Sequence, residues 1–339
     1  MPTTLADIAR ALGVSKMTVS RAINNHPEIH PETRARILDA ARRMNYRPNQ
    51  HARALTTNRS YLLGVVVPDL MHSYFAEICR GVEAVGKPVG YQNLICSTDE
   101  DAANEQVEIE ALLPRTDGLI LASSSPPAET KFYRRIIREG AKIVLIDRQL
   151  EGLRCPTVTT NDVKVGLLAT EHLINLGHRK VGHLKGTVAS TAALRFEGYQ
   201  RALAKHRLPF DKSLVRECGF TETDGYASMS AWLRDGSAPA AIFAANDPAA
   251  IGAMGAIEEA GLRIPEDVAL VGGGNIHYAD RLRVPLTTVA WSTSEMGQAA
   301  GQLLIGLIEG KRKHKEEHVM VEPELVVRTS CGATRAVQV

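Results

Sequence analysis

A short stretch near the start of the chain carries side chains whose types and spacing suit contact with nucleic-acid bases. In "LGVSKMTVSRAIN", residues 12–24, helical spacing turns Val19, Ala22 and Ile23 toward an inner face. The opposite face then carries Lys16, Met17, Ser20 and Arg21. An arginine can donate two hydrogen bonds to one guanine, and a methionine offers apolar contact, for example to a thymine methyl group. The outer face therefore predicts contact with base edges.

A second set of polar and aromatic side chains follows short apolar runs later in the chain. In open α/β sheets, ligands bind at the carboxyl ends of the strands, in the loops that begin the next helices. Planar Arg, Asn and Asp groups there suit hydroxyl groups, and aromatic rings suit the face of a saccharide or similar polar ring. The residues at these positions are Tyr74, Phe75, Arg148, Asn161, Asp162, Arg195, Phe220, Asn246, Asp247 and Trp291.

Several of these residues have an alternative, purely structural interpretation. Phe75 could pack the helix that it begins, Asp247 could cap a helix, and Arg195 could form a surface ion pair. Trp291 could belong to the core or to an interface, and the role of Asn246 stays open. For these residues the sequence alone does not decide between packing and ligand contact.

Three short amphipathic helices are predicted to hold the base-contacting face. Apolar residues at helical spacing over residues 5–12 predict a first helix, which Gly13 can end in the left-handed conformation. Ser15 suits the N-cap of a second helix, and Pro31 suits the first turn of a third. The buried stripe of the third helix would be Ile37, Ala40, Ala41 and Met44. This pattern predicts a helix-turn-helix, whose second helix enters the major groove of DNA. The alternative is an ordinary small helical bundle with a solvated basic face.

From Leu62 onward, strand-like apolar runs alternate with longer helical stretches. Runs such as "LLGVVVP", "AKIVLID" and "AAIFAAN" are each followed by a segment such as "VKVGLLATEHLINLG" or "DPAAIGAMGAIEEAG". The alternation is typical of βαβ units and of parallel sheets covered on both faces. Because the length is too great for one doubly wound sheet, we expect an α/β fold with two lobes and a ligand cleft between them.

The composition limits the class of protein. The chain has 339 residues and is 44% hydrophobic, enough for a substantial core divided among two or three domains. No apolar run is long enough to cross a membrane, and the N-terminus lacks the apolar core of a signal peptide. The five widely spaced cysteines form no CxxC pair, which favours a cytoplasmic protein without a disulfide framework or zinc site. Residues 1–60 hold ten Lys or Arg against four Asp or Glu, as a polyanion-binding surface would.

The segment "TLADIARALGVSKMTVSRAIN", followed by "YRPNQHARAL", resembles the DNA-binding headpiece and hinge helix of the LacI family of bacterial transcriptional regulators. The resemblance covers nearly the whole chain and implies a periplasmic-binding-protein-like fold for the two lobes. It implies that the second helix reads base edges and that a hinge leucine wedges into the minor groove. The base-reading residues would be Lys16, Met17 and Arg21, the phosphate-holding ones Ser15, Thr18 and Asn24, and the wedge Leu55. The full set of candidate DNA-binding residues adds Thr4, Ser20, Asn49, Ala52 and Arg53.

The expected domain boundaries follow from these patterns. The headpiece would span residues 1–47, the hinge helix and linker 48–60, and the effector-binding and dimerisation domain 61–339. Within that domain we expect lobe 1 over about 61–160 and 291–322, and lobe 2 over about 161–290 and 323–339.

The sequence departs from the family's pattern at two positions in the expected pocket. Where the family commonly reads "GFDD", this chain reads "GGGN", so an aspartate that often binds the ligand is replaced by Gly274. Trp291 stands where relatives are frequently polar. We therefore expect a pocket that is less acidic and more aromatic than a typical sugar site. The resemblance also implies that Arg195 lies in this effector pocket.

The sequence thus predicts a repressor controlled by a small-molecule effector, a sugar or sugar acid, with a nucleobase as the alternative. We expect it to bind palindromic double-stranded operator DNA as a homodimer, with no cofactor, metal or membrane partner, and not to be an enzyme. One rival is a doubly wound enzyme, for which "VGGGN" lacks the GxGxxG spacing of a dinucleotide-binding loop. Another is a transport-type sugar-binding protein, which would carry a signal peptide and no headpiece.

Overall fold

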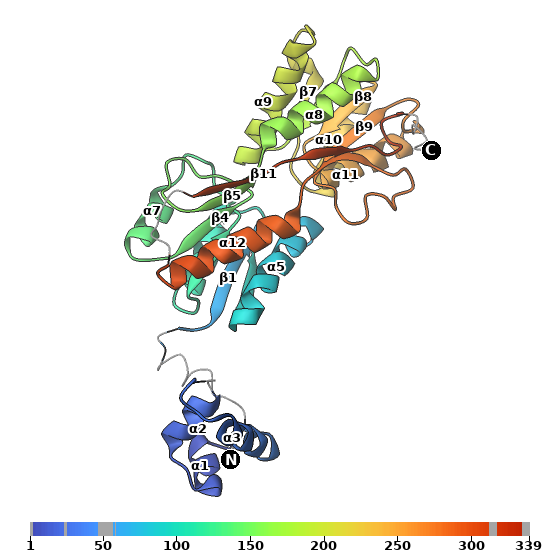
Figure 1. Ribbon diagram of the computed structural model, residues 1–339. Helices are drawn as coiled ribbons and strands as arrows, with labels where there is room; N and C mark the ends of the chain where they lie inside the picture. The colour runs from blue at the N-terminus through green and yellow to red at the C-terminus, as the bar shows by residue number, and fades with distance from the viewer. Residues whose placement is uncertain (1–2, 24–25, 47–56, 58, 312–316, 334–339) are drawn as a thin grey trace. The chain divides into compact units, whose positions relative to one another are not determined.

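The computed structural model describes residues 3–23, 26–46, 57, 59–311 and 317–333 (Figure 1). The chain divides into two compact units, Met1–Ser60 and Tyr61–Val339. The larger unit contains two six-stranded, mostly parallel sheets, so the predicted α/β class is confirmed. In the described part of the chain, no helix is both long and apolar enough to cross a lipid bilayer.

The smaller unit consists of the three predicted helices, α1 (Leu5–Leu12), α2 (Lys16–Ile23) and α3 (Pro31–Arg43). Thr4 caps α1 in a capping box with Asp7, and Gly13 ends it with a φ of 65° in the left-handed region. The Thr18 amide donates to Ser15 Oγ at 3.0 Å, so Ser15 caps α2 as predicted. The core of this unit is Ile8, Ala9, Val19, Ala22, Ile37, Ala40 and Ala41.

The larger unit is built on two sheets, one in each lobe. The first sheet has the order β11-β5-β4-β3-β1-β2, and all its paired strands are parallel. Its strands are β1 (Leu62–Val67), β2 (Gln92–Ser97), β3 (Gly118–Leu121), β4 (Ile143–Ile146), β5 (Thr157–Thr160) and β11 (His318–Val321). The second sheet has the order β12-β10-β9-β8-β6-β7, with β12 antiparallel to β10. Its strands are β6 (Gly182–Lys185), β7 (Val215–Glu217), β8 (Ala241–Ala244), β9 (Ala269–Gly273), β10 (Thr287–Ala290) and β12 (Glu324–Val326).

Helices cover both faces of each sheet because the strands are apolar on both sides. On the first sheet, Val65 of β1 packs toward α5 and α12, whereas Val66 packs toward α6 and α7. These helices are α5 (Ser73–Gly86), continued by η1 (Lys87–Val89), α6 (Ala102–Leu112), α7 (Lys131–Arg138) and α12 (Thr293–Ile308). On the second sheet, α8 and α9 cover one face and α10 and α11 the other. These are α8 (Asp162–Asn175), α9 (Ser190–Lys205), α10 (Glu222–Arg234) and α11 (Asp247–Glu259), with η2 (Lys212–Leu214) before β7.

The chain passes between the two lobes three times. It leaves the first sheet after β5, returns from β10 to α12, which packs beside α5 (Figure 1), and leaves again between β11 and β12. Consequently the carboxyl ends of strands from both sheets lead into loops near these crossings. Trp291 lies on the second crossing, directly after β10.

Glycines allow the helices within each lobe to approach closely. A Cβ atom on Gly166 of α8 would lie 1.9 Å from the Arg195 carbonyl oxygen, and one on Gly198 of α9 would lie 2.0 Å from the Val163 carbonyl oxygen. No side chain fits at such separations, so these two glycines set the distance between α8 and α9. Similar reciprocal glycine contacts join α5 to α12 and α10 to α11.

Candidate functional site

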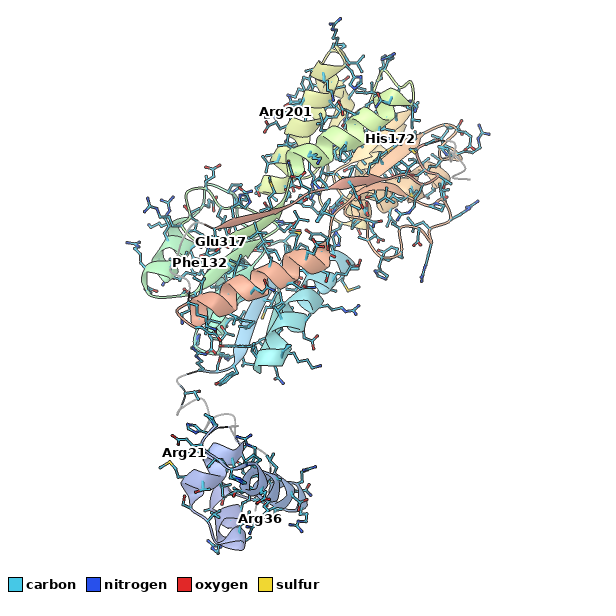
Figure 2. The ribbon with its side chains drawn as sticks, in the orientation of Figure 1. Arg21, Arg36, Phe132, His172, Arg201 and Glu317 are labelled. Carbon is cyan, nitrogen blue, oxygen red and sulfur yellow. The ribbon has the colours of Figure 1, made fainter. Side chains whose placement is uncertain are left out.

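The outer face of α2 exposes the predicted base-reading side chains. Met17 is 64% exposed, an unusual position for a large apolar side chain, and Lys16 is also exposed. Arg21, labelled in Figure 2, is half-exposed and its Nη1 lies 3.1 Å from Glu28 Oε2. The predicted residues Asn24, Asn49, Ala52, Arg53 and Leu55 lie outside the described residues. Lys16, Met17 and Arg21 on this face are thus accessible to solvent.

A small cavity of about 30 Å³ lies where loops from the two lobes meet. Its lining residues are His72, Tyr74, Phe75, Glu100, Asp147, Arg148, Thr191, Arg195, Phe220, Asn246, Gly273, Gly274 and Trp291. The lining includes every predicted effector residue except Asn161, Asp162 and Asp247. The structure therefore brings together side chains that are as much as 217 residues apart in sequence, as in the Tyr74–Trp291 contact.

Three aromatic rings form one wall of the cavity. Tyr74 and Phe75, at the start of α5, pack edge-to-face with ring centroids 5.1 Å apart, and Trp291 packs edge-to-face on Tyr74 at 5.9 Å. Trp291 Nε1 donates to the Tyr74 hydroxyl at 3.2 Å, which in turn donates to Asp147 Oδ1 at 2.6 Å. Burial, together with Asp147, raises the pKa of Tyr74 well above its usual range, so its hydroxyl remains a donor.

Arg195, on α9, is held against this wall by a buried ion pair. Its Nε donates to Asp162 Oδ1 at 2.8 Å, its Nη1 donates to the Ala245 carbonyl at 2.7 Å, and its guanidinium lies 5.1 Å from the Trp291 ring centre. The two side chains are 5% and 1% exposed, so the alternative of a surface ion pair for Arg195 is wrong. Burial raises the pKa of Asp162 to about 7, although Arg195 opposes the shift.

Arg148, directly after β4, forms the second buried ion pair of the cavity. Its two terminal nitrogens donate to the two carboxylate oxygens of Glu100 at 2.7 and 2.6 Å, a bidentate arrangement. Nη1 also donates to the Ser123 carbonyl at 3.2 Å, and the guanidinium lies 5.1 Å from the Phe220 ring centre. Because Phe220 belongs to the other lobe, Arg148 joins the two lobes across the cavity.

His72 lines the cavity together with Arg148 and Arg195 but carries no charge at pH 7. Burial, and then the nearby Arg148 and Arg195, lower the pKa of His72 to about 4, so the imidazole is neutral at pH 7. Its Nδ1 accepts a hydrogen bond from the Tyr74 amide at 3.2 Å and caps α5. A neutral His72 therefore fixes the start of the helix that presents Tyr74 and Phe75.

Three predicted residues have their polar groups engaged in helix caps or core contacts. Asn161 accepts from the Lys164 amide at 3.1 Å at the start of α8 and does not line the cavity. Asn246 accepts from the Ala249 amide at 2.9 Å and donates to the Phe220 carbonyl at 2.8 Å. Asp247 is fully buried and accepts from Thr288 Oγ1 at 2.6 Å and from the Ile276 amide at 2.9 Å. The N-cap of α11 is thus Asn246, and Asp247 does not make the cap that the sequence left open for it.

The cavity carries carboxylates of its own, although the expected comparison with a typical sugar site stays a prediction. Glu100 and Asp147 line the cavity, and Asp162 lies behind Arg195. Even at Gly274, where the family's aspartate is missing, a Cβ atom would lie 3.8 Å from Asp247 Oδ2. Gly274 has a φ of 129°, a conformation that residues with side chains rarely adopt. The acidic groups are therefore present, but they come from other loops.

The lining residues missed by the sequence analysis are His72, Glu100, Asp147, Thr191 and Gly273. Two of them lie at the carboxyl ends of strands, where ligands bind in open α/β sheets, and could have been found on that ground. Asp147 directly follows β4, and Glu100 lies in the loop after β2. His72 and Thr191 gave no comparable signal, because an isolated polar residue near a helix start is most often a cap.

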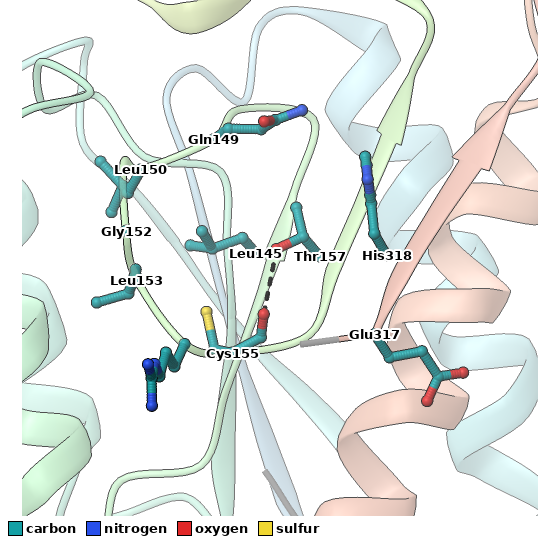
Figure 3. Close-up of a pocket in the computed structure, with 10 residues that line it drawn as sticks. Leu145, Gln149, Leu150, Gly152, Leu153, Cys155, Thr157, Glu317 and His318 are labelled. Carbon is teal, nitrogen blue, oxygen red and sulfur yellow. Dashed lines mark hydrogen bonds between the residues drawn. The ribbon is translucent and has the colours of Figure 1, made fainter. Parts of the chain in front are cut away.

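Another hollow, of about 470 Å³, lies beside the loop that follows β4 (Figure 3). It is lined by Leu145, Gln149, Leu150, Gly152, Leu153, Arg154, Cys155, Thr157, Glu317 and His318. None of the predicted effector residues lines it, and its one hydrogen bond drawn in Figure 3 runs from Thr157 Oγ1 to the Cys155 carbonyl at 3.3 Å. The mixture of guanidinium, carboxylate and aromatic groups is found in the smaller cavity, which is therefore the candidate ligand site.

Comparisons with known proteins match each of the two units to a family of known proteins. Residues 4–49 match the family "Bacterial regulatory proteins, lacI family", and residues 170–331 match "Periplasmic binding protein-like domain". The chain is 34% identical over 333 residues to the HTH-type transcriptional regulator DegA of Bacillus subtilis, covering 97% of this chain and 98% of that protein. It is 33% identical over 329 residues to the HTH-type transcriptional repressor PurR of Mannheimia succiniciproducens, covering 96% of this chain and 98% of that protein.

Solved structures extend the similarity to the whole fold. A Lac repressor dimer bound to operator and the anti-inducer ONPF matches with a TM-score of 0.84 and 26% identity, covering 98% of this chain and 100% of that one. A complex of the transcriptional regulator CelR with cellobiose matches with a TM-score of 0.73 and 27% identity, covering 97% and 99%. A regulator from Enterococcus faecium with bound ribose matches with a TM-score of 0.70 and 28% identity, covering 81% and 100%.

Proposed function

Because this chain belongs to the lacI family of bacterial regulatory proteins, we propose that it is a repressor whose binding to operator DNA is controlled by a small molecule held between its two lobes. The observation that carries this proposal is the convergence of Arg148, Arg195 and Trp291 with residues of both lobes on one cavity. A ligand there contacts both lobes at once and therefore favours one arrangement of the lobes over another. Such a regulator acts in the cytoplasm, where the bacterial chromosome lies.

The chemistry of the cavity favours a sugar or a sugar acid as the effector. Two guanidinium groups and several carboxylates offer donors and acceptors for hydroxyl groups, and the rings of Tyr74, Phe75 and Trp291 offer an apolar face. The cellobiose and ribose complexes of the similar regulators support the sugar class. A nucleobase is the second candidate, because the same rings could stack on a planar heterocycle.

The DNA-binding part of the proposal rests on the exposed face of α2. Lys16, Met17 and Arg21 are the residues that we propose to read base edges, with Thr4, Ser15, Thr18 and Ser20 beside them. The Lac repressor dimer bound to operator supports a homodimer on a palindromic site. On lobe 1, the exposed apolar side chains of Leu70 and Ile95 border a hollow of about 560 Å³ and suit a subunit contact.

Operator binding is tested with DNA selected from a random pool by the full-length chain. We expect Arg21→Ala to weaken binding to the best operator by about 1–3 kcal/mol and to relax the preference at one base pair. The control is Glu28→Gln, which removes only the carboxylate beside Arg21 and should preserve base preference. An equal loss of affinity for all sequences would mean that Arg21 contacts phosphate only, and no selectable operator would contradict the repressor itself.

The effector is tested by a thermal-shift screen of sugars, sugar acids, polyols and nucleobases on the native chain. A compound that binds only the folded state raises the Tm in proportion to the logarithm of its concentration above its Kd. We expect a compound of the sugar or sugar-acid class to raise the Tm and to change operator affinity. Stabilisation by nucleobases alone would favour the second candidate.

A further inference from the structure

We infer that Glu100 is an internal competitor for the guanidinium of Arg148, and that the effector carries a carboxylate group that replaces it. The inference rests on the proposed effector site and names the chemical class of its ligand. In this view the bidentate pair between Arg148 and Glu100 marks the place where a ligand carboxylate binds. A carboxylate from outside would meet the same two nitrogens in the same planar geometry.

The backbone that presents Glu100 is held in an unfavourable conformation. Asp99 and Glu100, in the loop from β2 to α6, have φ values of 54° and 58°, both in the left-handed region that residues with side chains rarely occupy. The loop is kept there by a hydrogen bond from the Glu100 amide to the Pro68 carbonyl at 3.0 Å. Its far end is fixed by Asp101, the N-cap of α6. A change of the loop that releases Glu100 therefore also relieves two unfavourable backbone conformations.

The size of the cavity requires that some side chain moves when a ligand enters. A cavity of about 30 Å³ has room for a water molecule but not for a sugar ring. Among the carboxylates of the site, the Glu100 side chain is 31% exposed, whereas those of Asp147 and Asp162 are 8% and 1% exposed. Glu100 can return to water with the smallest rearrangement, and it is therefore the group that we expect to leave.

The departure of Glu100 is favourable only if the ligand replaces its charge. Arg148 is 6% exposed, and without Glu100 its described acceptors would be the Ser123 carbonyl at 3.2 Å and Asp147, whose Oδ2 lies 3.8 Å from Nε. The two terminal nitrogens would then lose their bidentate partner in a buried site, which is unfavourable. Arg148 Nε makes no hydrogen bond with any described residue, but it lies 3.8 Å from Asp147 Oδ2, which stays beside the guanidinium when Glu100 leaves. A neutral ligand brings no such charge, so it would leave Glu100 in place. The geometry thus selects a sugar acid over a neutral sugar.

The test compares the full-length chain with Glu100→Gln, which keeps the shape of the side chain but removes its charge. The matched control is Glu110→Gln on α6, whose carboxylate pairs with the exposed Arg135 at 2.8 Å. The Kd of D-glucuronate is obtained from Tm shifts, with D-glucose as the neutral match and sodium chloride at equal ionic strength as the salt control. Sodium acetate serves as the probe of the carboxylate group alone.

We expect E100Q to bind D-glucuronate at least about tenfold more tightly than the wild type, a change of about 1.4 kcal/mol. Sodium acetate should stabilise E100Q more than the wild type, D-glucose should show no gain, and E110Q should behave as the wild type. Adding Arg148→Met to E100Q should abolish the gain, because the guanidinium that donates to the ligand carboxylate is then missing.

The inference is overturned if E100Q binds D-glucuronate and acetate no more tightly than the wild type and E110Q do. Weaker binding by E100Q would equally overturn it, because Glu100 would then be a ligand-binding group and not a competitor. Should E100Q fail to fold, Glu100→Asp is the second variant, because it shortens the competing side chain. It should bind D-glucuronate more tightly than the wild type, by a smaller factor than E100Q. If Glu100→Asp binds D-glucuronate no more tightly than the wild type, the inference is likewise overturned. Operator binding is measured on the same samples. A gain in E100Q without any effect on DNA binding would contradict the proposed function and leave the carboxylate site intact.

Discussion

At the scale of single residues, Arg195 and Asp162 form a pair in which neither charge reaches the solvent. Each member compensates the other's burial, and the remaining Nη1 hydrogen bond of Arg195 goes to the Ala245 carbonyl. The pair also holds the guanidinium against the Trp291 ring. Removing one partner therefore has a different effect from removing both.

We predict that Arg195→Ala alone destabilises the chain by about 3–5 kcal/mol, because it leaves the buried Asp162 without its partner. The double variant Arg195→Met with Asp162→Asn removes both charges at similar volume and should recover most of that stability. It should retain operator binding but lose the response to whichever screened compound stabilises the native chain. Unfolding in urea and operator binding with and without that compound measure the two effects. A double variant that still responds normally would contradict the role of Arg195 in the site.

At the scale of elements, the positions of the site residues depend on how closely paired helices approach each other. Arg195 and Asp162 lie on α9 and α8, whose separation is set by Gly198 and Gly166. The ridges of one helix can lie against the backbone of the other only because these positions lack a Cβ atom. The glycines therefore act on the ion pair, although neither of them touches the cavity.

Gly198→Ala is predicted to push α9 away from α8, since its Cβ atom would lie 2.0 Å from the Val163 carbonyl oxygen. We expect a loss of about 1–3 kcal/mol in stability, or more, and a weaker response to the effector. Gly255→Ala in α11 is the control, because its Cβ atom would meet only the Tyr226 ring at 3.7 Å. That substitution should be neutral or stabilise the chain by about 0.5–1 kcal/mol. Equal effects of the two substitutions would contradict the close-packing argument.

A stack of rings connects α9 to the second sheet and gives it a dependence on pH. His183 on β6 lies between the rings of Tyr199 and Phe243, with centroids 5.2 and 4.7 Å away, and its Nδ1 lies 2.9 Å from the Phe243 carbonyl oxygen. Burial lowers the pKa of His183 from 6.5 to about 4. Between these values the unfolded chain binds a proton that the folded chain does not, so this contribution to stability is lost as the pH falls.

For His183→Phe we predict a smaller loss of stability on acidification than for the wild type. From pH 7 to pH 5 the difference between the two proteins should be about 2 kcal/mol, whereas at pH 7 the variant should lose about 1 kcal/mol with the hydrogen bond to Phe243. Other histidines with lowered pKa, such as His72, are present in both proteins and cancel in the comparison. Parallel pH profiles from urea unfolding would show that the pKa of His183 is the same in the folded and the unfolded chain.

The elements of the fold and many of the site residues could be predicted from the sequence. The side chains with which those site residues form ion pairs and hydrogen bonds could not. The alternation of apolar runs and helical stretches predicted the α/β fold, because each run is long enough to be buried on both faces. Tyr74, Arg148 and Trp291 were predicted from their positions after apolar runs, because ligands bind at the carboxyl ends of strands in open α/β sheets. That prediction needs only the local order of residues along the chain. The pairing of Arg148 with Glu100, 48 residues away, depends on which strands lie side by side. The sequence does not state that order, and for this reason Glu100 was not among the predicted site residues.

At the scale of the whole larger unit, two contacts link the lobes across the cavity. The Gln149 amide donates to Ser190 Oγ at 2.8 Å, and the Arg148 guanidinium lies over the Phe220 ring. In each contact the first residue follows β4 of the first sheet and the second belongs to the other lobe. Because three chain crossings also join the lobes, a ligand that alters these two contacts changes the lobe arrangement as a whole.

Trp291 should make the intrinsic fluorescence of the protein sensitive to ligand binding. The chain has two tryptophans, and the other, Trp232 on α10, is fully buried in the core of the second lobe. Trp291 instead lies against the Arg195 guanidinium and the Tyr74 hydroxyl, so its emission depends on charges that an entering ligand rearranges. We predict that Trp232→Phe preserves a ligand-dependent change in intrinsic fluorescence and that Trp291→Phe removes it. A response that follows Trp232 would place the rearrangement outside the cavity. With that assignment made, the unlabelled protein would serve as a fluorescent sensor of its own effector.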